Sequence, residues 1–156
     1  MAELAENFVL PGEQGTPSLS AQVNGPSYSR RARTALVISQ DPLGAALLGA
    51  ATELAGCRVA YVLEGESVPD AIRRVKPVAV LLDATHPIVS EPASLGPALM
   101  TGASVILFGA PARLRDLAAL IATSRASTIA LPDGIGELPA LLTSAAAPHP
   151  RRSRSE

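Results

Sequence analysis

Five short apolar runs constrain the fold of this chain most strongly, because none of them alternates apolar with polar residues. The runs are TALVIS (34–39), RVAYVL (58–63), VAVLLD (78–83), SVILFG (104–109) and STIALP (127–132). A strand with one face in water alternates apolar and polar residues, whereas a strand covered on both faces is apolar throughout. The runs therefore predict the strands of a parallel sheet that is buried between two layers of helices.

Helix signals fill the gaps between the predicted strands. The first helix is expected to begin at the N-cap Asp41 with Pro42 in its first turn, and to close at Gly56. Its apolar residues recur at helical spacing, and they are Leu43, Leu47, Ala51 and Leu54. Further helices are predicted after the N-cap Ser67 and over 93–101, 112–124 and 134–145, the last with Pro139 as a kink or a late start.

Alternating strands and helices predict an α/β fold: a three-layer α/β/α sandwich with a five-stranded parallel sheet and flavodoxin-like (βα)5 topology. The predicted domain covers residues 33–145. Residues 1–32 are rich in Gly, Pro, Ser, Gln and Asn, which predicts a flexible N-terminal arm, and residues 146–156 are expected to form a disordered tail. In such sheets the functional site lies beyond the carboxyl ends of the strands.

Composition excludes several classes of protein. A net charge of −1 and an aromatic fraction of 3% argue against binding to nucleic acid or to an anionic membrane surface. The uncharged stretch 92–112 contains three prolines, and its solidly apolar part is too short to span a bilayer. Cys57 is the only cysteine, so no internal disulfide can form, and we expect a buried thiol in a cytoplasmic protein.

The third predicted strand carries the main functional signal. It ends at Asp83, and Pro87 follows four residues later. With the five βα units and the spacing from Gly109 to Leu131–Pro132, this pattern resembles the response-regulator receiver domain family (CheY-like) over residues 34–145. The resemblance implies a role in two-component signalling, with Asp83 at the position of the phosphoryl acceptor.

The sequence departs from the family at every position that assists the acceptor. The resemblance places a Mg²⁺-binding acidic pair at Ser39 and Gln40, a hydroxyl side chain at Gly109 and a lysine at Leu131. Without them the charge of a phosphoryl group moving onto a carboxylate is not offset. The pattern implies a degenerate, or pseudo-, receiver that has no cofactor, is not an enzyme and acts by binding a protein, either a signalling kinase or a downstream regulator. A homodimer is a further possibility.

Two alternatives stay open from the sequence. In the first, the chain is a conventional response regulator that a histidine kinase phosphorylates on Asp83, with Mg²⁺ and with help from Asp41. In the second, it is a small-molecule binder or an enzyme on a flavodoxin-like fold. A phosphohydrolase would need an acid where Thr85 stands.

Two further groups of polar residues are assigned structural roles. Asp83 and His86 form an Asp-x-x-His pair, but the second histidine of the chain, His149, lies in the predicted tail. We therefore predict no metal site, and expect His86 to bond a backbone group of its loop. A solvated face is expected for the charged residues of the predicted fourth helix, which are Arg113, Arg115 and Asp116.

Overall fold

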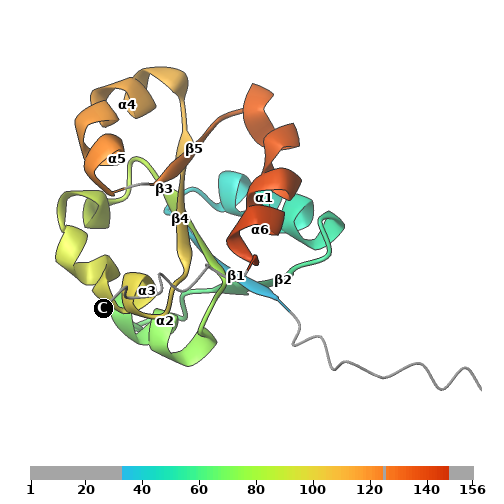
Figure 1. Ribbon diagram of the computed structural model, residues 1–156, viewed down its shortest axis with the longest axis vertical. Helices are drawn as coiled ribbons and strands as arrows, with labels where there is room; N and C mark the ends of the chain where they lie inside the picture. The colour runs from blue at the N-terminus through green and yellow to red at the C-terminus, as the bar shows by residue number, and fades with distance from the viewer. Residues whose placement is uncertain (1–32, 125, 148–156) are drawn as a thin grey trace, which may run out of the picture.

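The computed structural model describes residues 33–124 and 126–147, and these form the predicted three-layer sandwich (Figure 1). The predicted arm at 1–32, residues 148–156 of the predicted tail and His149 lie outside the described residues. The sheet consists of β1 (Thr34–Ile38), β2 (Arg58–Tyr61), β3 (Ala79–Asp83), β4 (Ser104–Gly109) and β5 (Ser127–Ala130). All pairings are parallel and the strand order is β2-β1-β3-β4-β5. The predicted fold class is confirmed.

Helices cover both faces of the sheet. The α-helices are α1 (Pro42–Leu54), α2 (Val68–Val75), α3 (Gly96–Met100), α4 (Pro111–Asp116), α5 (Ala118–Ser124) and α6 (Leu138–Ala145). Short 3₁₀ turns η1 (Pro87–Ser90), η2 (Pro92–Leu95) and η3 (Asp133–Glu137) connect them. α1 and α6 lie on one face, whereas α2 to α5 lie on the other (Figure 1). No helix in these described parts of the chain is both long and apolar enough for a membrane crossing.

The central strand β3 explains why the strand runs are apolar throughout. Its five residues are all buried. Ala79 and Leu81 belong to the core cluster under α1 and α6, whereas Val80 and Leu82 belong to the cluster under the other helices. Successive side chains of a strand point to opposite faces, so a strand covered on both sides needs an apolar residue at every position.

Several predicted element boundaries are wrong. The helix expected over 93–101 is instead η2 followed by the five-residue α3, because Pro97 within this segment lacks the N–H that a continuous helix requires. The helix expected over 112–124 is divided at Leu117, whose N–H bonds to Leu114 in a tightened turn. In the last helix Pro139 lies in the first turn of α6, so it marks a late start.

The apolar residues that recur at helical spacing in α1 do not mark its buried face: of the four, only Ala51 packs against the core. Leu43, Leu47 and Leu54 are 78%, 46% and 90% exposed, respectively, whereas Leu48, Gly49 and Thr52 are buried against the sheet. The helix is apolar on most sides, so periodicity alone could not select the buried face. Gly49 lies on the buried side of the helix, where an added Cβ would meet the hydroxyl at the end of the half-exposed Tyr61 side chain on β2.

Thr52 generates a test of the core beneath α1. Its side chain is fully buried and its hydroxyl has no hydrogen-bond partner. Replacing that hydroxyl with a methyl group removes an unsatisfied polar atom, so Thr52→Val is expected to raise the free energy of unfolding by about 1 kcal/mol. Thr52→Ser, which keeps the hydroxyl and loses the methyl group, is the matched control and is expected to destabilise. Urea unfolding of the three proteins measures this, and a less stable Thr52→Val would contradict it.

Candidate functional site

Asp83 lies at the carboxyl end of β3, where the strand order reverses between β1 and β3. This reversal is the position at which doubly wound sheets place their sites. The residue is 6% exposed and is one of two buried polar residues among those described, the other being Thr52. The sequence prediction that placed a carboxylate at this edge is confirmed, although the position alone assigns no chemistry.

Three hydrogen bonds from the protein hold the Asp83 carboxylate. The backbone N–H and the hydroxyl of Thr85 both donate to Oδ1, at 2.8 and 2.7 Å. The Ser39 hydroxyl donates to Oδ2 at 2.8 Å, and the same hydroxyl oxygen accepts the backbone N–H of Asp41 at 3.0 Å. Because Ser39 directly follows β1 and Asp83 ends β3, these bonds connect the ends of the two strands at the switch point.

The hydrogen bonds determine the charge state of Asp83. Burial disfavours the carboxylate and by itself would raise the pKa of Asp83, but the donors on Thr85 and Ser39 outweigh burial and lower the pKa from its ordinary 3.8. A lowered pKa in the folded state stabilises the protein above pH 3.8, and this contribution is lost as the pH falls through the folded value. Asp83 is therefore an anion at neutral pH.

A shallow hollow of about 330 Å³ opens above Asp83. It brings together several residues predicted to belong to the site: Asp41, Asp83, Thr85, Gly109 and Leu131. The rest of its wall is lined by Gly44 of α1, Phe108 of β4 and Ala110. The walls thus place one hydrogen-bonded carboxylate beside an N-capping carboxylate, a glycine and an aliphatic side chain.

These residues fit Mg²⁺ poorly. The ion is usually held in octahedral geometry by one or two carboxylates together with several water molecules. Both oxygens of Asp83 accept hydrogen bonds, and the two oxygens of Asp41 accept the backbone N–H groups of Leu43 and Gly44 at 3.1 and 3.0 Å, as the predicted N-cap requires. In the described residues no three His, Cys, Asp or Glu side chains cluster as a metal site would need.

The remaining predicted site residues lie around this hollow or beside it. Gln40 is exposed. His86 accepts the Ile88 N–H through Nδ1 at 3.2 Å and caps the 3₁₀ turn that Pro87 begins, which confirms the expected backbone role. His86 also lines a second hollow, of about 480 Å³, near the carboxyl ends of β1 and β2 together with Ser39 and Glu66.

Sequence reasoning missed two features of the site. Arg113 was expected on a solvated face, but it is half-buried and its Nε donates to the Ala84 carbonyl at 3.1 Å, whereas Arg115 and Asp116 are exposed. A separation of 29 residues leaves no local signal for this contact. The hydrogen bonds from Thr85 to Asp83 did have a local signal in the sequence, because an Asp commonly accepts the N–H two residues later in a turn.

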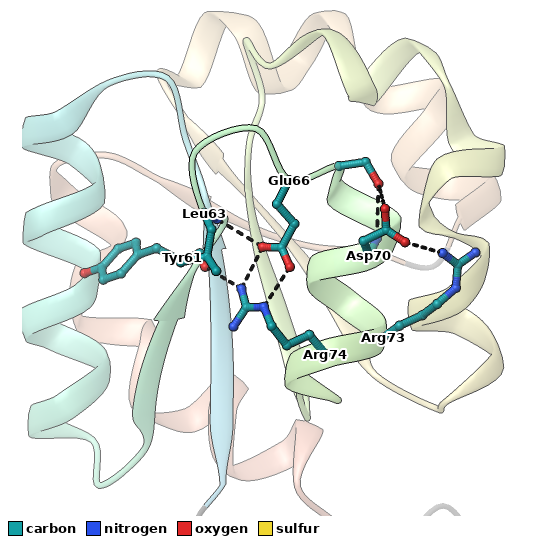
Figure 2. A network of polar contacts seen from close by, with 7 residues as sticks. Tyr61, Leu63, Glu66, Asp70, Arg73 and Arg74 are labelled. Atoms are coloured by element: carbon teal, nitrogen blue, oxygen red, sulfur yellow. Dashed lines mark hydrogen bonds and ion pairs between the residues drawn. The ribbon is translucent and has the colours of Figure 1, made fainter.

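A bidentate ion pair braces the edge of the sheet next to the second hollow (Figure 2). Arg74 on α2 donates through Nε to Oε1 of Glu66 and through a terminal nitrogen to Oε2, both at 2.7 Å, and also to the Tyr61 carbonyl at 3.1 Å. The Leu63 N–H donates to the same carboxylate at 3.0 Å. These donors lower the pKa of Glu66 from 4.5 to about 2. The network joins the end of the edge strand β2 to α2.

Comparison with known proteins extends what the geometry shows. No family model matches the sequence, and no curated protein matches it. Solved structures do match. The receiver domain of a sensor histidine kinase from Pseudomonas aeruginosa has a TM-score of 0.58 at 19% identity, covering 72% of this chain and 96% of that one. The chain has the receiver-domain fold.

Two further solved structures have similar folds. A sensor protein from Polaromonas sp. JS666 has a TM-score of 0.57 at 24% identity, covering 72% of this chain and 94% of that one. A response regulator protein from Burkholderia multivorans has a TM-score of 0.50 at 23% identity, covering 76% of this chain and 98% of that one. The Pseudomonas structure holds a magnesium ion in its active-site cleft. The receiver fold predicted from the sequence is confirmed.

Neighbouring arginines on α2 provide a matched test of the ion pair. The Arg74–Glu66 pair has side chains 41% and 14% exposed, whereas the Arg73–Asp70 pair is 64% and 61% exposed. Arg74→Gln should therefore lower the melting temperature at neutral pH clearly more than the control Arg73→Gln.

The same pair predicts a pH dependence. Because the pKa of Glu66 is depressed, its contribution is present above pH 4.5 and is lost as the pH falls towards about 2. The difference in melting temperature between wild type and Arg74→Gln should narrow over that interval. Equal effects of the two substitutions at neutral pH would contradict the assignment.

Proposed function

We propose that this chain is an atypical receiver-type signalling domain that acts by binding another protein and is not phosphorylated in a Mg²⁺-dependent reaction. The observation that carries the proposal is the environment of Asp83, whose two carboxylate oxygens accept three hydrogen bonds from Ser39 and Thr85. Asp83 then serves as an anchor between the ends of β1 and β3.

The electrostatics of phosphoryl transfer support this proposal. Transfer to a carboxylate brings negative charge onto negative charge, and a cation must offset it. The positions that supply a metal-binding pair, a hydroxyl and a lysine in the receiver family are Ser39, Gln40, Gly109 and Leu131 in this chain. Hydrogen bonds that lower the pKa of Asp83 also lower its basicity and hence its strength as a nucleophile.

Exposed apolar side chains support the second part of the proposal, binding to a protein. Large hydrophobic residues that are at least about half exposed occur on α1, on α3 and after β2, and include Leu54, Leu63, Leu99 and Met100. Those on α1 recur along a single helix, and an apolar patch of that kind on a water-exposed domain commonly marks a protein interface. A signalling kinase or a downstream regulator is the proposed class of partner, and the cytoplasm the proposed location.

A phosphorylation assay tests the role of Asp83. The full chain is incubated with Mg²⁺ and a small acyl phosphate donor, beside a conventional receiver domain as positive control, and intact masses are measured. We expect the control to gain the mass of one phosphoryl group and this chain to gain none. Stoichiometric modification that is lost in Asp83→Asn would overturn the proposal and favour the conventional response regulator.

A further inference from the structure

The imidazole of His86 caps the 3₁₀ turn η1 in a way that only its neutral form allows. Its Nδ1 accepts the backbone N–H of Ile88 at 3.2 Å, so Nδ1 carries no proton and the proton of the neutral ring is on Nε2. A protonated imidazole has an N–H on both ring nitrogens and accepts no hydrogen bond. The Ile88 N–H therefore loses this bond whenever His86 takes up a proton, although Ile88 itself is only 7% exposed.

Loss of the cap acts on a buried segment. Ile88 and Val89 of η1 are both buried in the core cluster beneath α2 to α5. Pro87 has no N–H, so the Ile88 N–H is the first donor of the turn, and it takes the imidazole as its partner. The bonds from Val89 to the His86 carbonyl, at 3.0 Å, and from the exposed Glu91 to the Ile88 carbonyl, at 2.9 Å, do not involve the ring. Protonation is therefore expected to loosen the start of the turn and to leave the rest of it in place.

The charged groups around His86 attract a proton to its ring. Asp83, three residues earlier at the end of β3, is a buried anion that interacts electrostatically with His86. Glu66 lines the same hollow as His86, but its charge is offset by the bidentate pair with Arg74 on α2. Tyr61, the other titratable residue among those described that line this hollow, places its hydroxyl against α1, away from Glu66 (Figure 2). A proton on His86 thus gains the attraction of Asp83 while it breaks the cap.

We propose that His86 is a pH-sensitive switch of the loop between β3 and η1. The neutral imidazole holds the loop closed on the Ile88 N–H, and the protonated imidazole releases it. Unperturbed histidines titrate near pH 6.5, so a switch of this kind operates in the physiological range. The loop also contains Thr85, which lines the hollow above Asp83, so proton uptake acts at the edge of the sheet where doubly wound folds place their sites. The switch does not depend on the proposed role of the chain in binding another protein.

An NMR titration of the full chain tests the switch. The ring signals of His86 and the backbone amide of Ile88 are followed from about pH 8 to about pH 5, the range in which histidines change charge. We expect the Ile88 amide proton to move upfield as its hydrogen bond is lost, with the same midpoint as the His86 ring. The chain has two histidines, so the ring signal that disappears on substitution of His86 identifies it and leaves that of His149.

Two substitutions at the same position separate the cap from the charge. His86→Asn keeps a side-chain oxygen that can accept the Ile88 N–H but does not titrate, so the Ile88 amide should keep its downfield position throughout. His86→Ala has no acceptor, and its Ile88 amide should lie at the low-pH position of wild type at every pH. An Ile88 amide that does not move while His86 titrates would overturn the proposal. So would a shift that persists in His86→Asn, or a His86 ring that does not titrate in this range.

Discussion

Asp83 ends a strand that is covered by helices on both faces, so burial would oppose its negative charge unless nearby groups stabilised it. The protein supplies that stabilisation from both sides of the switch point, through the hydroxyl of Ser39 after β1 and through two donors of Thr85 after β3. These bonds keep the ends of the two central strands together. The hollow above them therefore has a floor that is held by hydrogen bonds within the protein.

The hydrogen bonds to Asp83 satisfy its carboxylate within the receiver fold, but they do not supply what phosphoryl transfer to a carboxylate requires. Neutral hydroxyl and amide donors suffice for one carboxylate, but they bring no positive charge to offset an incoming phosphoryl group. Asp41, the second carboxylate near the site, is also bonded within the protein. Its two oxygens accept backbone N–H groups in the first turn of α1, because Asp41 is the N-cap of that helix. We infer that a receiver fold was retained here as a surface for binding, with the acidic residue kept as a structural anchor.

Sequence patterns predicted the sheet and the position of Asp83 because both depend on local rules: uninterrupted apolar strands, N-caps and a carboxylate at a strand end. They could not select the buried face of α1, because leucines occur on both sides of the helix and the buried residues include Gly49 and Thr52. The role of Arg113 depends on a contact with Ala84, which is far away in the chain. In the sequence, Ser39 stands where the receiver family has an acidic residue, which gives no sign of its role. In the structure its hydroxyl donates a hydrogen bond to Asp83.

The central claim is that hydrogen bonds from the protein, and not a metal ion, stabilise the Asp83 carboxylate. The most direct test is the pKa of Asp83, measured by ¹³C NMR of its carboxyl carbon with and without excess Mg²⁺, in wild type and in Ser39→Ala. We predict a pKa below 3.8 that Mg²⁺ does not change and that rises when the Ser39 hydroxyl is removed. A pKa at or above 3.8 in wild type, or one that falls further when Mg²⁺ is added, would contradict the claim.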